Sequence, residues 1–123
     1  MRIGNVSASK YHNRKTKGFD SAKEWRRNQE LEALQRAGEI SELNRQVPFV
    51  LVPSYTIADE TTRQGFRTVR EIRYIADFTY RLKDGKRIIE DVKGMQTDVF
   101  KIKRKLLERK IALGAIEGEF RIY

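Results

Sequence analysis

The segment that most constrains the fold is an alternating run of residues that ends in a tight turn. Apolar and polar residues alternate from Arg70 to Leu82, which predicts a strand whose two faces differ. One face carries Ile72, Tyr74, Ala76, Phe78 and Tyr80, and the other carries Glu71, Arg73, Ile75, Asp77 and Thr79. Lys83-Asp84-Gly85 is expected to turn, and residues 86–93 to return as the next strand. The chain therefore contains an antiparallel hairpin around which a sheet can form.

The length of the turn decides which side chains face one another across this hairpin. A two-residue turn at Asp84-Gly85 would set Asp77 opposite Val92. A three-residue turn, with Gly85 in the left-handed conformation, would set Asp77 opposite Asp91. Both turns are common for such a sequence. We expect the three-residue turn, which places the two aspartate β-carbons roughly 5 Å apart.

Two facing carboxylates repel each other unless a positive charge neutralises them, and a divalent cation can do this. Magnesium prefers hard oxygen ligands and keeps several waters, so Asp77, Asp91 and the main-chain carbonyl of Val92 form a candidate metal site. Lys93 shares a strand face with Asp91 and could orient or deprotonate a water near a phosphate. The alternative is an exposed strand face on which acids and a lysine pair harmlessly. For Asp91-Val92-Lys93 alone, that alternative is the more frequent one.

The other elements follow from capping residues and hydrophobic periodicity. A helix is expected from an N-cap at Asp20 or Ser21 to Ala37, with Gly38 as its left-handed stop. The expected later elements are a strand at 47–52, a loop or widened hairpin connection at 53–68, a helix from Thr97 or Asp98 to about Ala112, and a strand at 117–123. The order helix, three strands, helix, strand predicts an α/β domain.

Two helical positions bear on function. Glu24 lies on the line of Leu31 and points toward the face that the leucines cover, which allows two interpretations. It is either a functional acid or only the glutamate of a Ser-x-x-Glu capping box. In the second helix, one line is expected to hold Val99, Ile102, Lys103, Leu106 and Lys110, widened by Phe100 and Leu107, while Lys101, Arg104, Lys105 and Arg109 occupy the opposite face.

Charge is the most informative part of the composition. The 123 residues fit one domain and carry a net charge of +9, which predicts attraction to polyanions, nucleic acid above all. A ribosomal-type or merely soluble basic protein is the alternative. The chain has no cysteine, which excludes disulfides, thiol catalysis and Cys-based zinc sites. No run approaches the roughly 20 apolar residues that span a bilayer, and no signal-peptide core is visible, so we expect a cytoplasmic protein.

Basic residues gather in two places. Residues 1–19 have no acidic side chain and are interpreted as a flexible arm ahead of a single domain at 20–123. The candidate DNA-binding residues are Lys10, Arg14, Lys15 and Lys17 in the arm and Lys101, Arg104 and Lys105 on the second helix. A solvated tail without a partner is the alternative for the arm. Such an arrangement favours contacts to the backbone and shape of DNA over readout of its sequence.

These residues resemble the PD-(D/E)XK nuclease superfamily. Its pattern is matched by Ile75-Ala76-Asp77-Phe78 and Glu90-Asp91-Val92-Lys93-Gly94, although alanine replaces the proline that names the motif. More closely, the chain is similar to a group of short phage-encoded proteins of this superfamily. The shared features are Lys10-Tyr11, Ser21 to Glu24, Ala37 to Ile40, Gln46, Tyr74 to Phe78 and Asp91 to Gly94.

The resemblance implies a restriction-endonuclease-like αβββαβ core, with a mixed sheet flanked by helices. It also implies that Glu24, Asp77 and Asp91 bind one or two magnesium or manganese ions and that Lys93 assists the attacking water. Gln46 would contact the metal-bound water or the phosphate, or would be only an ordinary strand-edge amide.

Among the nucleases of this superfamily, a Holliday junction resolvase-like enzyme acting on branched DNA is the leading hypothesis. Symmetric cleavage of a junction needs two active sites, which a homodimer supplies. The apolar segment with Ile111, Ala112, Leu113, Ala115 and Ile116 would serve as the interface or, more often in such segments, as part of the monomer core. The competing class is a non-catalytic DNA-binding or phage accessory protein on the same scaffold, which would not need Asp77, Asp91 and Lys93 together.

Overall fold

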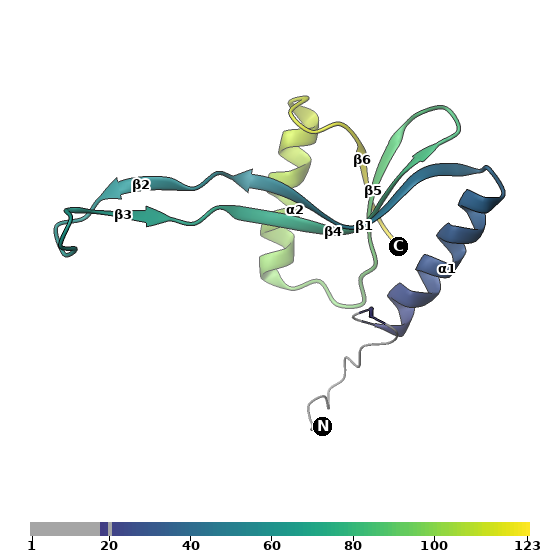
Figure 1. Ribbon diagram of the computed structural model, residues 1–123, viewed down its shortest axis with the longest axis horizontal. Coiled ribbons are helices and arrows are strands. Elements are labelled where there is room, and N and C mark those ends of the chain that lie inside the picture. Colours follow the sequence, from purple (N-terminus) through teal and green to yellow (C-terminus); the bar gives the residue numbers. More distant parts are fainter. Residues whose placement is uncertain (1–17, 20) are drawn as a thin grey trace, which may run out of the picture.

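The computed structural model describes residues 18–19 and 21–123. Its elements are α1 (Ala22–Arg36), β1 (Ile40–Val52), β2 (Tyr55–Ala58), β3 (Phe66–Val69), β4 (Ile72–Leu82), β5 (Arg87–Asp91), α2 (Asp98–Ala112) and β6 (Glu119–Ile122). Both helices and both ends of the main sheet are labelled in Figure 1. The expected arm at 1–19, with Lys10, Arg14, Lys15 and Lys17, lies almost wholly outside the described residues. None of the helices in the described part is long and apolar enough to cross a membrane.

A mixed four-stranded sheet lies between the two helices. Its strand order is β1-β4-β5-β6, and only the β5–β6 pair is parallel. The neighbouring residues Ile88 and Ile89 of β5 point to opposite faces, because successive strand side chains alternate. Ile88 packs in one buried cluster with Leu31 of α1, and Ile89 in another with Leu107 of α2. The expected α/β domain with a sheet flanked by helices is therefore confirmed at this level.

Both helices begin and end as the capping residues predict. The Ser21 hydroxyl accepts a hydrogen bond from the Glu24 amide, and the Thr97 hydroxyl accepts one from the Phe100 amide. Gly38 adopts a φ of 80°, and the amides of Gly38 and Glu39 donate back to the last turn of α1. Of the expected alternatives, Ser21 and Thr97 are the N-cap residues.

Of the two alternatives expected for the segment at 53–68, a loop or a widened hairpin connection, the structure has the hairpin. The segment contains β2 and β3, which form a separate two-stranded hairpin that extends away from the main sheet (Figure 1). Its tip is held by the Asp59 carboxylate, which accepts from Thr61 and pairs with Arg67 at 2.9 Å. The sequence lacks a clear alternation here because all of β2 and most of β3 is solvent-exposed on both faces. Short exposed strands leave little hydrophobic pattern to detect.

The expected single buried face of residues 72–80 is wrong in one respect. Tyr74 and Ala76 pack in the cluster below α2, whereas Phe78 and Tyr80 pack in the cluster below α1. The change of face occurs around Asp77, which lies opposite Gln46 in the register of β1 and β4. Gln46 has a φ of 53°, a left-handed conformation that interrupts regular pleating, so strict alternation does not continue through this point.

The apolar side of α2 also differs from the expectation. Phe100 and Leu107 are its buried residues, whereas Val99 and Ile102 are 62% and 61% exposed. The helix therefore rests on the sheet through the edge of the expected apolar stripe, because the aromatic ring of Phe100 fits against Tyr74 with centroids 6.2 Å apart. Of the C-terminal apolar segment, Ile111 and Ile116 pack against the core of the monomer.

Candidate active site

The turn between β4 and β5 has the three-residue geometry expected from the sequence. The Leu82 amide donates to the Lys86 carbonyl at 2.9 Å, and Gly85 adopts a φ of 90°. The register pairs Arg81 with Arg87 and Phe78 with Glu90, so the next position sets Asp77 against Asp91. The expected juxtaposition of these two acids is confirmed.

Asp77 and Asp91 lie where their strands separate, and each carboxylate accepts a hydrogen bond from a main-chain amide across the gap. The Asp77 amide donates to Asp91 Oδ1 at 3.0 Å, and the Val92 amide donates to Asp77 Oδ2 at 2.9 Å. Each carboxylate thus accepts a hydrogen bond that a main-chain carbonyl would accept in a regular sheet. This exchange fixes both side chains and keeps the two like charges together.

Gln46 connects this pair to α1. Its side-chain amide donates to Glu24 Oε2 at 3.1 Å and to Asp77 Oδ1 at 3.3 Å. Glu24 is buried although it lies in the first turn of its helix, and Arg45 Nη2 lies 4.0 Å from the same carboxylate oxygen. The left-handed backbone of Gln46 costs on the order of 1–3 kcal/mol for a residue with a side chain. Strain of this kind persists only where the surroundings hold the residue in place.

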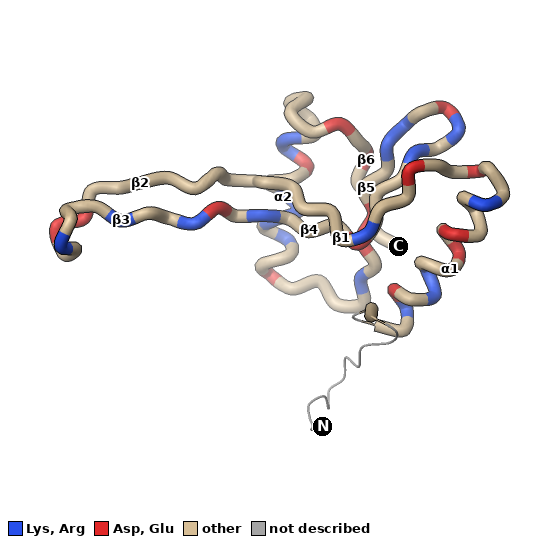
Figure 2. The backbone as a smooth tube through the Cα atoms, viewed as in Figure 1, with Lys and Arg blue, Asp and Glu red and all other residues tan. Residues whose placement is uncertain are grey.

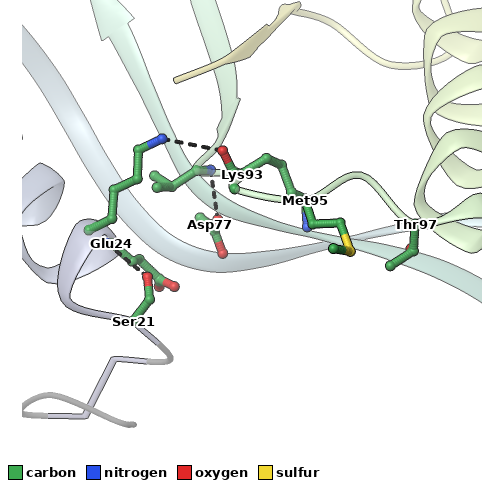
Figure 3. Close-up of a pocket in the computed structure, with 9 residues that line it drawn as sticks. Ser21, Glu24, Asp77, Lys93, Met95 and Thr97 are labelled. Atoms are coloured by element: carbon green, nitrogen blue, oxygen red, sulfur yellow. Dashed lines mark hydrogen bonds between the residues drawn. The ribbon is translucent and has the colours of Figure 1, made fainter. Parts of the chain in front are cut away.

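Lys93 approaches the same acids from the segment after β5. Its ammonium lies 3.5 Å from Asp91 Oδ2 and 4.6 Å from the centre of the Phe100 ring. Lys23, one residue before Glu24, donates from its ammonium to the Lys93 carbonyl at 3.2 Å. This contact ties the start of α1 to the residues that follow β5 (Figure 3).

Two residues of the site were missed in the sequence. The buried Tyr74 hydroxyl donates to Asp91 Oδ2, and burial together with this contact raises the pKa of Tyr74. Lys23 reaches the site through the Lys93 carbonyl. A signal existed for Tyr74, because a tyrosine in a row of buried residues needs a partner for its hydroxyl. No sequence signal distinguishes Lys23 from other surface lysines.

The acidic side chains of the site lie close together, and this proximity affects the pKa of Asp77. Burial is the largest cause that raises the pKa of Asp77, to about 7, and the neighbouring charges of Asp91 and Glu24 add to it. The hydrogen bond from the Val92 amide acts in the opposite direction, but it does not compensate. A bound cation would relieve the same repulsion that here favours protonation of Asp77.

A pocket of about 510 Å³ opens beside these residues. It is lined by residues of α1, β4 and the β5–α2 connection, among them Lys23, Glu24, Asp77, Val92, Lys93 and Thr97. Glu24 and Asp77 extend into it from different elements, as Figure 3 shows. The structure thus brings Glu24, Gln46, Asp77, Asp91, Val92 and Lys93 into one region of the molecule.

The expected basic residues of α2 do not join this pocket. Lys101 and Lys105 are exposed, and Arg104 pairs with Glu108 at 3.4 Å. Arg104 also lies over the Phe120 ring at 5.2 Å. Figure 2 shows Lys and Arg distributed over several elements of the described chain rather than gathered beside the acids.

The donor set can be compared with the needs of particular metals. Within residues 18–19 and 21–123, no group of three or more His, Cys, Asp or Glu side chains is arranged to hold an ion. Zinc, which takes three or four protein ligands, is therefore a poor match. Magnesium commonly binds through one or two carboxylates and keeps several waters, and the Asp77–Asp91 pair fits that requirement.

Comparison with known proteins gives one match. Residues 8–120 match the family described as Protein of unknown function (DUF1064). No curated protein and no solved structure matches the chain.

Proposed function

The chain belongs to the DUF1064 family, and from its site we propose that it is a metal-dependent nuclease that hydrolyses phosphodiester bonds in DNA. The observation that carries the proposal is the pair of Asp77 and Asp91, with Glu24, Gln46 and Lys93 converging on it. A buried cluster of like charges is costly unless it serves a ligand. The high net positive charge of the chain supports a polyanionic substrate.

Magnesium or manganese would be held by Asp77 and Asp91. Glu24 and the main-chain carbonyl of Val92 would reach the ion through its bound waters, since no three acidic side chains of the described residues are arranged to hold it directly. When bound, the ion supplies Lewis-acid activation of the phosphate and lowers the pKa of a water. The Gln46 amide holds Glu24 and Asp77 in a common orientation, through bonds of 3.1 and 3.3 Å. The protein's contribution is thus to fix the donors before the substrate arrives.

Lys93 is the residue proposed to act on the attacking water and the phosphate. Its ammonium is close enough to Asp91 to be positioned by it, yet it also lines the open pocket. There it can orient a water for attack and offset negative charge that develops on the phosphate oxygens. Tyr74 holds Asp91 from the buried side, and it is a positioning residue because it acts through Asp91.

The order of elements is compatible with the restriction-endonuclease-like core. When the β2–β3 hairpin is set aside, α1, β1, β4, β5, α2 and β6 follow the order αβββαβ, in a mixed sheet with helices on both faces. Asp77 on the second of these strands and Asp91 on the third occupy the positions that the resemblance implies. This agreement supports the proposal, although fold alone does not determine an activity.

We extend the proposal to branched DNA as the substrate, to a homodimer as the working form and to the cytoplasm as its location. Incubation with a synthetic four-way junction, a flap and a linear duplex, each with magnesium ion or EDTA, tests the proposal. We expect cleavage of the branched substrates in magnesium only. Equal cleavage of linear duplex would refute the structural preference and leave the nuclease activity standing.

The second candidate function is a DNA-binding protein without catalysis. It is favoured by the hydrogen bonds that already occupy oxygens of Asp77 and Asp91. Tight binding to all three substrates with no cleavage in magnesium or manganese would support this candidate and overturn the nuclease proposal.

A further inference from the structure

Two further hollows continue from the active-site pocket along the surface between β4 and α2. The first, of about 280 Å³, shares Lys93 and Thr97 with the pocket and also reaches Asp91. The second, of about 320 Å³, shares Arg73, Val99 and Lys103 with the first. The three hollows form one path, whose outer part we call the β4–α2 channel. It is lined by Ile72, Arg73, Ile75, Val99, Ile102 and Lys103.

The channel presents apolar side chains to solvent. Ile72 and Ile75 project from β4, and Val99 and Ile102 from α2, and all four are exposed. The two helical residues belong to the line that was expected to be buried against the sheet. Because α2 rests on Phe100 and Leu107 instead, this line is left facing the channel.

Cations border these apolar residues along the path from the active site. Lys93 marks the inner end, and Arg73 and Lys103 lie further out. Lys103 follows Val99 by one helical turn, so its ammonium extends along the same side of α2. Arg73 is held by Glu71 at 3.3 Å, and Lys103 makes no ion pair within the described part of the chain. Apolar contact surfaces and positive charges therefore occur side by side.

We propose that the β4–α2 channel binds an unpaired strand of nucleic acid that leads away from the active site. The inference rests on the proposed function, because it names the form of substrate that the same site receives. Phosphates along the strand meet Lys93, Arg73 and Lys103. The faces of unstacked bases cover the exposed isoleucine and valine side chains.

The combination of apolar and basic side chains favours an unpaired strand over a duplex. A duplex keeps its bases stacked and offers mainly phosphate and sugar to a surface without a groove-reading element. An unpaired strand also exposes base faces, which proteins stack on aromatic side chains beside a basic track or hold against apolar side chains. The opposite side of α2 lacks this combination. Lys101 and Lys105 lie there, and no exposed apolar residue lies between them on that face.

The test measures binding separately from cleavage. Fluorescence anisotropy of the full chain in EDTA gives the affinity for a labelled thymine oligonucleotide and for a blunt duplex of equal length. We expect the double variant Val99→Ser, Ile102→Ser to bind the oligonucleotide roughly fivefold or more weakly, with little change for the duplex. Leu113→Ser, a similarly exposed apolar residue at the end of the same helix, is the matched control and should change neither affinity.

A charge variant tests the channel independently of the apolar residues. Lys103→Ala should weaken binding of the oligonucleotide and lower its salt dependence, by about 0.7 in the logarithmic slope for one lost phosphate contact. Lys101→Ala removes the same charge from the other face of α2 and should have the smaller effect on the oligonucleotide. Equal effects of the two lysine variants, or equal losses for oligonucleotide and duplex in the serine variant, would overturn the inference.

Cleavage assays in magnesium separate this inference from the proposed function. If the chain cuts no substrate but its affinity for the oligonucleotide depends on Val99, Ile102 and Lys103, the channel stands and the nuclease proposal fails. If branched DNA is cut and the channel variants bind and cut as the unchanged chain does, the nuclease proposal stands and the channel fails. A dimer in sedimentation that the serine variant dissociates would identify the channel as a protein interface and overturn the inference.

Discussion

Two neighbouring acids on β5 have different charged and hydrogen-bonding partners on the two faces of the sheet. Glu90 and Asp91 are each 2% exposed, and they point to opposite faces. On the α1 side, Arg27 binds Glu90 through two nitrogens at 2.7 and 2.9 Å, and Tyr80 donates to it at 2.6 Å. Glu90 is thus neutralised by a bidentate guanidinium, the geometry best suited to a carboxylate.

Asp91 has a different environment on the other face. Its tyrosine partner is Tyr74, but its neighbours include Asp77, a second acid, and its cation is Lys93 at 3.5 Å on the border of a pocket. The pairing of Glu90 is complete within the protein, whereas the cluster around Asp91 has an excess of negative charge. The comparison teaches that burial alone does not identify a functional acid. The balance of charge around each acid is what separates Asp91 from Glu90.

The largest expected effect separates the two acids by activity. Asp91→Asn or Lys93→Ala should lower cleavage of DNA by about a thousandfold, because each removes a group that the proposed function assigns to the phosphate or to the metal. For Asp91→Asn, the free energy of unfolding should change by no more than about 1 kcal/mol, since loss of one like charge offsets the lost hydrogen bonds. Gel assays of cleavage and urea unfolding measure the two quantities. Loss of folding together with loss of activity would assign Asp91 a structural role.

The next effect concerns the acid on the α1 face. Arg27→Ala should destabilise the protein by about 3 kcal/mol or more, because it leaves the Glu90 carboxylate buried and unpaired. Urea unfolding checks this value. Arg26→Ala, at an exposed position of the same helix, is the matched control and should have little effect. If Arg27→Ala unfolds no more easily than the control, the contrast between the two faces is wrong.

The pH dependence of stability sharpens the comparison. The pKa of Asp77 is about 7 in the folded chain against an ordinary value of 3.8, so folding favours the protonated form. In metal-free protein, this contribution to stability is fully present below about pH 4 and is lost as the pH rises through about 7. We expect Asp77→Asn to flatten the decline in unfolding free energy between about pH 5 and pH 8.

Two measurements accompany this pH test. Glu60→Gln at the exposed tip of the β2–β3 hairpin is the control and should retain the decline. Addition of magnesium ion at about pH 8 should restore stability to the unchanged chain, because a ligand that binds only the folded state stabilises it. A decline that persists in Asp77→Asn would show that another group causes it.

The smallest effects come from the two tyrosines, one beside each acid. Tyr80→Phe should lower stability by about 1 kcal/mol or somewhat more, because it removes a hydrogen bond to a charged group, and it should leave cleavage unchanged. Tyr74→Phe removes the bond to Asp91, and under the proposed function it should weaken the affinity for magnesium by roughly tenfold, as loss of an outer partner of a metal ligand does. Calorimetric titration with magnesium measures the difference. Similar affinities for magnesium in the two variants would contradict the difference between the two faces of the sheet.

The sequence predicted the juxtaposition of Asp77 and Asp91 better than it predicted the packing around them. The turn Lys83-Asp84-Gly85 is local, so its glycine determines the register that brings Asp77 to Asp91. The proximity of Gln46 and Glu24 to Asp77 depends on how β1 and α1 pack against β4. Only the resemblance suggested this proximity. The change of face at Asp77 could not be predicted, because a left-handed conformation at a glutamine has no sequence signature. The exposure of Val99 and Ile102 depends in turn on how Phe100 fits against Tyr74, which is a matter of tertiary packing.

The β2–β3 hairpin has a consequence for how the protein can be dissected. Val52 and Ile72 are direct partners in the register of β1 and β4, so the main sheet could be closed at this point by a short reverse turn. Residues 53–71 instead form an outlying ribbon whose strands pair chiefly with each other. The ribbon is therefore a module that can be excised while the strands bearing Gln46 and Asp77 stay joined. The contribution of the ribbon to stability or binding can then be measured by subtraction, with Gln46, Asp77 and Asp91 left in place.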